Sequence, residues 1–230
     1  MHTMDSVFPT AAMPFQLAGA AAIARDARDA THDRRIDLLS QRLAIHLSQE
    51  VWQRLFHGTG RQGISFSQAP LSVLFIESLL GDGAGSSHED FFGTLERLAR
   101  EHDGSVDAFA WGGSLVFFAQ AAGAVRTAMA LQNAVPERKL RMGVHHGDCL
   151  LARFRSAGVS HATLLGSEAT QAAAVAGATD YGSVGLSSPV STEWLARVAQ
   201  DTGSASGWQC ERFGNGSMRL VPTHRSKRAA

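Results

Sequence analysis

Two adjacent histidines and a nearby aspartate are the densest group of chemically capable side chains in the sequence. Imidazole and carboxylate groups such as those of His145, His146 and Asp148 can bind a metal ion or transfer protons. The hydrophobic residues on either side predict strands, however, and neighbouring residues of a strand point to opposite faces of a sheet. We therefore expect that the two imidazoles do not share an ion, and that His145 is a structural histidine.

The cysteines and the paired glycines are weaker candidates for functional residues. Cys149 and Cys210 are far apart and lack CxxC spacing, so the sequence indicates neither a zinc site nor a disulfide framework. Gly112 and Gly113 resemble a phosphate-binding loop only superficially, because no G-x-x-x-x-G-K-[ST] motif accompanies them, and a hairpin turn is the better interpretation. Two thiols without a pairing pattern are typical of a reducing compartment, and we expect a cytoplasmic protein.

The composition excludes several classes of protein. The 230 residues include 21 Lys and Arg against 21 Asp and Glu, and 44% are hydrophobic, which is not typical of a disordered chain. A nucleic-acid-binding protein usually has a basic surplus, whereas here the basic residues gather only in a tail at 223–230. The sequence contains no run of about 18 apolar residues, so no membrane span is predicted.

Hydrophobic periodicity divides the chain into segments. Residues 1–33 show no regular apolar period and are interpreted as a flexible leader. Residues 34–58 repeat apolar side chains every three or four positions, which predicts an amphipathic helix. These side chains are Ile36, Leu39, Leu43, Leu47, Val51 and Leu55. Residues 59–70 are interpreted as a polar linker. The apolar stripe of the helix must be buried, either on the following domain or on a second copy of the chain.

Strands and helices alternate through the domain at residues 71–222. Strands are predicted at residues 71–76, 106–110, 114–118, 139–144, 149–154, 183–187, 208–213 and 218–221. Helices are predicted at residues 91–102, 121–133, 168–178 and 191–199, the first behind a capping box at residues 87–90. This alternation predicts an α/β fold, an α+β sandwich in which helices pack on one sheet.

Four segments, in this order, resemble the catalytic domain of class III nucleotidyl cyclases, the adenylate and guanylate cyclases. Residues 71–78 (LSVLFIES) resemble its opening strand, and residues 130–134 (ALQNA) resemble the end of one of its helices. Residues 140–148 (LRMGVHHGD) are similar to its R-x-G-hydrophobic-H-x-G strand, and residues 164–166 (LLG) begin a segment similar to its G-D-x-V-N helix. The resemblance covers roughly residues 43–200. It implies a ferredoxin-like βαββαβ core with an added C-terminal hairpin and an N-terminal helix.

The resemblance also identifies where metal ligands would lie. In that family two aspartates hold two metal ions, which activate the 3′-hydroxyl and neutralise the triphosphate. The first aspartate aligns with Glu77, and the second aligns with Gly112, which has no side-chain oxygen. Because a hard cation needs several oxygen ligands, no metal site is expected, and Glu77 is interpreted as a residue that caps the end of a strand.

The positions that would contact a nucleotide differ from the family as well. The purine-selecting Lys aligns with Ala108, and its acidic counterpart aligns with His161. The ribose-orienting Asn aligns with Thr170, and the transition-state Arg aligns with Ala174. Loss of a single charge-stabilising group typically raises the barrier by about 2–4 kcal/mol, so loss of most of the set should abolish turnover. No catalytic residue and no cofactor is therefore expected, with Mg²⁺ or Mn²⁺ needed only if residual cyclase activity exists.

The sequence thus predicts a catalytically degenerate cyclase-homology domain, a pseudo-enzyme in intracellular signalling of the cyclic-nucleotide type. Its expected partner is a second copy, or another cyclase-type or signalling protein, and not a nucleic acid. One alternative is an active cyclase, or one half of a heterodimer, that makes a cyclic nucleotide from ATP or GTP. Another is a non-catalytic module that binds a nucleotide or another small ligand in the old cleft.

Overall fold

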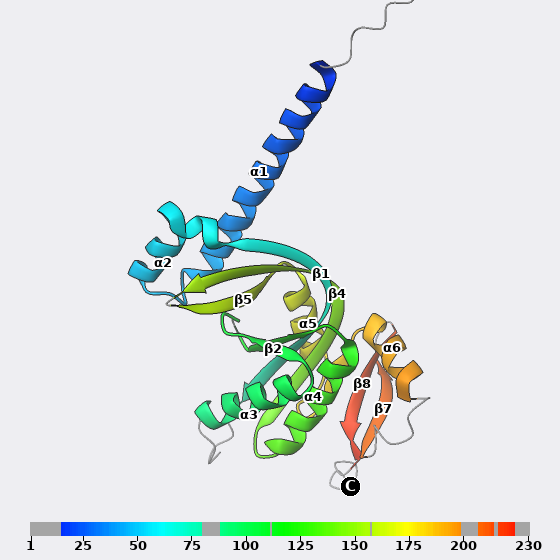
Figure 1. Cartoon of the computed structure of the whole chain (residues 1–230). Coiled ribbons are helices and arrows are strands. Elements are labelled where there is room, and N and C mark those ends of the chain that lie inside the picture. Colours follow the sequence, from blue (N-terminus) through cyan, green and yellow to red (C-terminus); the bar gives the residue numbers. More distant parts are fainter. Residues whose placement is uncertain are drawn as a thin grey trace, which may run out of the picture.

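A ferredoxin-like unit forms the centre of the computed structural model, which describes residues 15–79, 88–110, 112–156, 158–198, 207–213 and 216–223 (Figure 1). Its elements are β1 (Ser65–Leu79), α3 (His88–Glu101), β2 (Gly104–Asp107), β3 (Ser114–Phe118), α4 (Ala121–Ala134) and β4 (Lys139–Ser156). The four strands lie in the order β2-β3-β1-β4, and each neighbouring pair is antiparallel. The predicted α/β class and βαββαβ core are confirmed.

The remaining strands extend the sheet from β4. The short strand β6 (Val184–Leu186) is parallel to β4, β8 (Ser217–Pro222) pairs with β6, and β7 (Trp208–Phe213) completes the predicted C-terminal hairpin. The helices α5 (Glu168–Gly177) and α6 (Ser188–Val198) lie where the sequence predicts them. The strand β5 (Val159–Leu165), which was not predicted, pairs with the second half of β4 and forms with it what we call the β4–β5 arm.

One uninterrupted ladder joins β1 to β4. Every residue of β1 from Ser65 to Leu79 has a partner on β4. The prediction of two strands around Gly147 and Asp148 is therefore wrong. Gly147 does not turn the chain, because it lies opposite Leu71 within the ladder.

The same ladder changes the start of the domain. Residues 65–70, predicted as part of a linker, are the first residues of β1 and pair with the β4–β5 arm. The segment that precedes them is the 3-10 turn η1 (Gly58–Gly63) rather than an irregular linker.

Two helices precede this turn, α1 (Phe15–Leu43) and α2 (Gln49–Phe56). The single helix predicted over residues 34–58 is therefore wrong, and the expected leader boundary at residue 33 falls inside α1. Ser48 begins α2 as its N-cap, where its hydroxyl accepts a hydrogen bond from the Val51 amide. Alanine has the highest helix propensity, which explains a helix in a segment without apolar periodicity.

The apolar stripe of α1 is buried against its own chain. Ile36, Leu39 and Leu43 are 3%, 0% and 0% exposed, and they pack in one cluster with Phe154 and Leu165 of the β4–β5 arm. Of the two predicted fates of this stripe, the structure shows burial on its own domain for these three side chains. Residues 1–14, residue 87 of the capping box and residues 224–230 of the tail lie outside the described residues.

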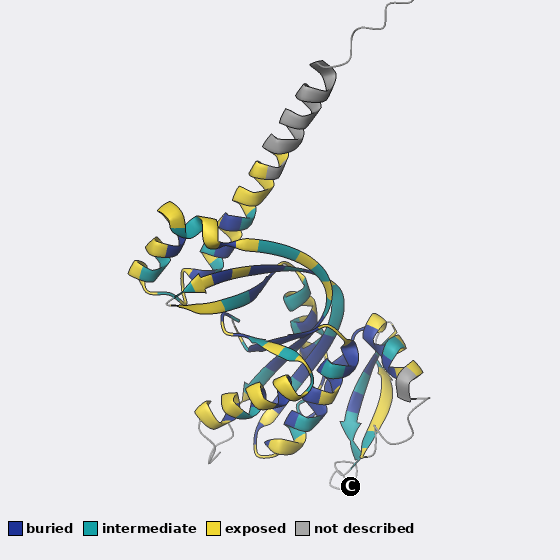
Figure 2. Ribbon diagram, viewed as in Figure 1, coloured by how far each residue is buried: buried dark blue, intermediate teal, exposed yellow. Residues whose placement is uncertain are grey.

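Helices cover the two faces of the sheet unequally (Figures 1 and 2). The helices α3, α4 and α6 lie over one face, whose core includes Leu74, Val116 and Met142. The short helix α5 lies over the other face, where Leu71 and Phe75 are only half-buried. In the described part of the chain, no helix combines the length and the apolar character that a bilayer crossing requires.

The close approach of α5 to β4 gives a test of this packing. A methyl group on Gly143 would overlap the backbone of Ala172 and Ala176, whereas one on Gly93 in α3 would meet no atom within 4 Å. We expect Gly143→Ala to lower the free energy of unfolding by about 2 kcal/mol, and Gly93→Ala to raise it by about 0.5–1 kcal/mol. Urea unfolding measures both, and equal effects of the two changes would contradict the packing.

Candidate functional site

A cross-strand ion pair involves Glu77, the residue that aligns with the first metal-binding aspartate of the cyclase family. Glu77 of β1 is directly opposite Arg141 of β4. The Arg141 guanidinium donates to Glu77 Oε2 from Nε, at 3.0 Å, and from Nη2, while the Tyr181 hydroxyl donates to Oε1 at 2.7 Å. The Arg141 guanidinium also lies 4.9 Å from the centre of the Tyr181 ring. Both carboxylate oxygens of Glu77 therefore have partners.

These contacts set the charge of the Glu77 side chain. The hydrogen bonds from Arg141, and then from Tyr181, hold the pKa of the Glu77 carboxyl below its ordinary value, against a smaller opposing effect of burial. The Glu77 and Arg141 side chains are 29% and 26% exposed, so solvent screens the pair only in part. Glu77 is thus held as a carboxylate whose charge Arg141 neutralises. The interpretation of Glu77 as a simple strand cap is incomplete.

Glu77 and Gly112 line one cavity of about 370 Å³, which we call the α3 pocket. Gly112 is exposed and adopts a φ of +76°, the left-handed conformation in which a glycine is favoured. The structure therefore brings the two aligned metal positions together, but only one of them has a side chain. Within the described residues, no three His, Cys, Asp or Glu side chains gather closely enough to hold an ion.

A buried cation also lines the α3 pocket. Arg138 is 2% exposed, and its guanidinium lies 4.8 Å from the centre of the Phe91 ring and 3.4 Å from Ser78 Oγ. His88, at the start of α3, and Ser114, at the start of β3, complete the polar part of the lining. The lining of the α3 pocket thus includes the buried guanidinium of Arg138 and the carboxylate of Glu77, which is paired with Arg141.

The four residues that align with nucleotide-binding positions of the cyclase family do not lie together in one pocket. Thr170 is exposed on α5 and lines a second cavity of about 220 Å³, the α5 pocket, together with Arg42 of α1 and Ala110. Ala174 lies one turn further along α5, is exposed, and lines neither pocket. Ala110 lines both pockets, and therefore lies between the aligned metal positions of the α3 pocket and Thr170 in the α5 pocket.

The remaining aligned positions, Ala108 and His161, flank an aromatic cluster. Ala108 is exposed directly after β2. The half-buried His161 ring of β5 lies 5.3 Å from the ring centres of both Phe109 and Phe154. His161 therefore packs against apolar rings, in place of the acidic residue that the family resemblance implies.

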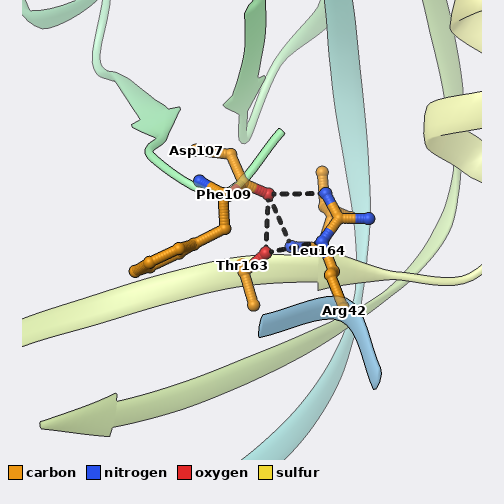
Figure 3. Close-up of polar contacts among 5 residues, drawn as sticks. All are labelled: Arg42, Asp107, Phe109, Thr163 and Leu164. Carbon is orange, nitrogen blue, oxygen red and sulfur yellow. Dashed lines mark hydrogen bonds and ion pairs between the residues drawn. The ribbon is translucent and has the colours of Figure 1, made fainter. Parts of the chain in front are cut away.

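A buried carboxylate next to this cluster was not predicted as a site residue. Asp107 is 3% exposed and accepts hydrogen bonds at 2.9 Å from the Phe109 amide, the Thr163 hydroxyl and the Leu164 amide (Figure 3). The Arg42 guanidinium lies 3.4 Å from the same carboxylate and donates to Thr163 Oγ1 at 3.1 Å. This network joins α1, β2 and β5.

The adjacent histidines point to opposite faces of β4, as predicted. His146 Nδ1 lies 2.9 Å from Ser72 Oγ across the ladder, and His145 lies opposite Val73. Burial is the main cause that lowers the pKa of His145, which favours its neutral form. Burial likewise raises the pKa of the Cys149 thiol to about 11, so this cysteine is not a nucleophilic thiolate.

Arg141 and Tyr181 are two further residues whose roles the sequence did not reveal. Arg141 belongs to the cyclase-like segment, but its pairing with Glu77 depends on the strand register. Tyr181 is the one tyrosine of the chain and lies 104 residues beyond Glu77. A two-metal site does not fit these residues, because Glu77 is engaged by Arg141 and Tyr181 and Gly112 supplies no ligand.

The pH dependence of the free energy of unfolding tests whether Glu77 is ionised and bound to Arg141 and Tyr181. Because the folded pKa of Glu77 is below its ordinary value of 4.5, the ion pair stabilises the fold above that pH, and the effect is lost as the pH falls. We expect Glu77→Gln to lower the free energy of unfolding by about 1 kcal/mol at pH 7 and by much less at pH 3.

Tyr181→Phe is the matched control, because it removes one hydrogen bond and keeps the ion pair. Its effect should be smaller than that of Glu77→Gln at pH 7. A cost of Glu77→Gln that stays constant, or grows, as the pH falls would contradict the arrangement described above.

Among known proteins, the chain is similar to several solved structures of cyclases. No protein-family model matches the chain, and no curated protein matches it. The chain is similar to the adenylyl cyclase CyaB from P. aeruginosa, with 15% identity over 69% of this chain and 96% of that one, at a TM-score of 0.49. It is similar to an adenylate/guanylate cyclase/hydrolase from Silicibacter pomeroyi, with 15% identity over 69% and 99% of the two chains, at a TM-score of 0.49.

A third similar structure is the guanylyl cyclase Cya2, with 17% identity over 68% of this chain and 92% of that one, at a TM-score of 0.47. The identities are below 25% and the TM-scores are below 0.5, and the ferredoxin-like core is defined by the strand order and pairing of this chain alone.

Proposed function

We propose that this chain is a catalytically degenerate cyclase-homology domain that acts by association, as a dimerising or regulatory module in intracellular signalling of the cyclic-nucleotide type. The observation that supports it best is the engagement of Glu77 by Arg141 and Tyr181. A metal ion at this carboxylate would have to compete with a guanidinium and a phenol that already bind it.

The second aligned metal position supports the same proposal. Gly112 offers no ligand, so any cation bound at Glu77 would lack the second carboxylate of a two-metal clamp. Ala108 and Ala174 offer no charge or hydrogen-bond donor to a nucleotide from their side chains. The groups that would stabilise charge in the transition state are thus replaced at several positions at once.

The half-covered face of the sheet supports association. Leu71, Phe75, Ala110, Ala162 and Ala169 are partly buried apolar residues at the border of the core under α5. Apolar side chains at the edge of a buried cluster favour contact with another protein surface, because burial removes them from water. A second copy of the chain is the partner that needs no other component.

Nucleotide turnover is the direct test of the degenerate state. The protein is incubated with ATP or GTP and Mn²⁺ or Mg²⁺, and cyclic nucleotide is measured by mass spectrometry. We expect no product above that of heat-denatured protein. Product that increases in proportion to the concentration of folded protein would contradict the proposal and favour an active cyclase.

Light scattering tests the association. We expect a dimer, and we expect Phe75→Glu to raise its dissociation constant by at least about tenfold, because a charge would have to be buried at the interface. Leu195→Glu is the matched control, since Leu195 is an exposed apolar residue of α6. A wild-type chain that stays monomeric at high concentration, or equal effects of the two substitutions, would contradict this part of the proposal.

The α3 pocket favours one second candidate, a module that binds a small phosphorylated ligand without turning it over. A cavity of about 370 Å³ with the buried Arg138 in its lining supports it. Calorimetry with ATP, GTP and inorganic pyrophosphate in the absence of a divalent metal would measure such binding. No heat at millimolar ligand would contradict this candidate.

A further inference from the structure

Two rows of mostly small residues form the contact between α5 and β4. Each row follows the period of its element, every second residue on the strand and every fourth residue on the helix. The rows are Gly143, His145 and Gly147 on β4, and Glu168, Ala172 and Ala176 on α5. A methyl group on Gly143 would overlap the backbone of Ala172 and Ala176, and one on Gly147 would lie 3.2 Å from Glu168 Cγ. The helix and the strand are therefore packed at backbone distance along both rows.

His145 and Glu168 are the two larger side chains of these rows, and they lie together. His145 Nε2 and Glu168 Cγ would each be 3.2 Å from the same methyl group on Gly147. Both side chains are half-buried, and the Ser167 hydroxyl donates to Glu168 Oε1 at 3.2 Å. A contact made of glycine and alanine thus contains one imidazole and one carboxylate, each from a different element.

The other groups around His145 bring no charge to it from the neighbouring strands. Val73 of β1 lies directly opposite His145, and on the other side of β4 the Ser187 amide donates to the Val144 carbonyl. The titratable neighbours on the same strand are His146, Asp148 and Cys149. The first points to the opposite face, the second is exposed, and burial raises the pKa of the third to about 11. Among the described residues, Glu168 is therefore the charged group that faces His145 from another element.

Protonation of His145 would place a positive charge in this contact. Burial is the main cause that lowers the pKa of His145, and the negative charge of Glu168 opposes this effect only in part. The N-terminal end of a helix also disfavours a nearby cation. Because the folded pKa lies below the ordinary value of 6.5, the neutral imidazole stabilises the docked helix above that pH, and this stabilisation is lost as the pH falls. Acid therefore weakens the contact between α5 and β4.

A weaker contact has consequences for the sheet face that α5 covers. Ala169 and Thr170 of α5 line the α5 pocket together with Phe75 of β1. Ala172 packs in one buried cluster with Cys149 of β4. A shift of α5 therefore moves one wall of the α5 pocket and changes the cover of this cluster.

We propose that His145 and Glu168 form a pH-sensitive contact, which holds α5 on β4 at neutral pH and loosens it when His145 is protonated in mild acid. The shape of the α5 pocket then depends on pH. The proposal goes beyond the proposed function, because it holds whether or not the domain turns over a nucleotide and whether or not it dimerises.

NMR on the full chain, between about pH 8 and about pH 5, tests this proposal. Long-range proton–nitrogen spectra follow the His145 ring, and carbon-13 labelled alanine methyl groups follow Ala172 and Ala176. We expect His145 to titrate below its ordinary pKa of 6.5, and both methyl resonances to shift with the same midpoint. The methyl resonance of Ala128, which is buried in α4, should not follow this midpoint.

Two variants separate the contact from a general response to acid. His145→Gln removes the titratable ring, so it should abolish the shift of the Ala172 methyl resonance. Glu168→Gln should move the midpoint to lower pH, because the carboxylate of Glu168 raises the pKa of His145. His88→Gln, at an exposed histidine of α3, is the matched control and should change neither result.

Each outcome supports or overturns the proposal. A shared midpoint that is lost in His145→Gln and lowered in Glu168→Gln supports it. Methyl resonances of Ala172 and Ala176 that stay constant while His145 titrates overturn it, and so does an equal shift at Ala128, which would report loosening of the whole core. If His145→Gln does not fold, Glu168→Gln decides, and an unchanged midpoint in that variant overturns the proposal.

Discussion

The antiparallel pairing of β1 with β4 is the constraint on which the cleft depends. The register of a ladder fixes which side chains meet across two strands, and a slip of one residue would move each of them to the other face. Here the register sets Glu77 opposite Arg141, so the carboxylate at the aligned metal position meets a guanidinium within the sheet itself. The length of the same ladder extends β4 into the arm on which β5, α1 and α2 pack.

The buried charge of Asp107 joins α1 to this framework. A carboxylate is costly to bury unless hydrogen bonds and a cation compensate for its lost hydration, and Asp107 obtains its partners from its own loop, from β5 and from α1. One network therefore joins α1, the end of β2 and β5. The carboxylates of Glu77 and Asp107 are each paired with an arginine of the same chain, Arg141 and Arg42.

Local patterns in the sequence predicted most strands and helices of the core, but they did not predict the contacts between side chains in the site. The apolar run at residues 71–76 and the C-terminal hairpin have periods and turn residues that do not depend on distant contacts. The strand predicted at residues 106–110 instead ends at Asp107, whose carboxylate accepts a hydrogen bond from the Phe109 amide. Gly147 and Asp148 have the composition of a turn, but pairing with β1 keeps them extended, and β5 was not predicted because its sequence alternates weakly. The pairing of Glu77 with Arg141 and Tyr181 could not be predicted, because it depends on a register and on a loop 104 residues away.

We propose that Glu77 binds Arg141 and Tyr181 in place of a metal ion. An NMR titration with Mn²⁺ tests this proposal, because a bound paramagnetic ion broadens the resonances of nearby nuclei. We predict that the Arg141 Nε–H resonance broadens no more than that of Arg97, which forms an exposed ion pair with Glu101 on α3. Selective broadening of the Arg141 resonance at low Mn²⁺ concentration, with a chemical shift that reports a broken ion pair, would contradict the claim.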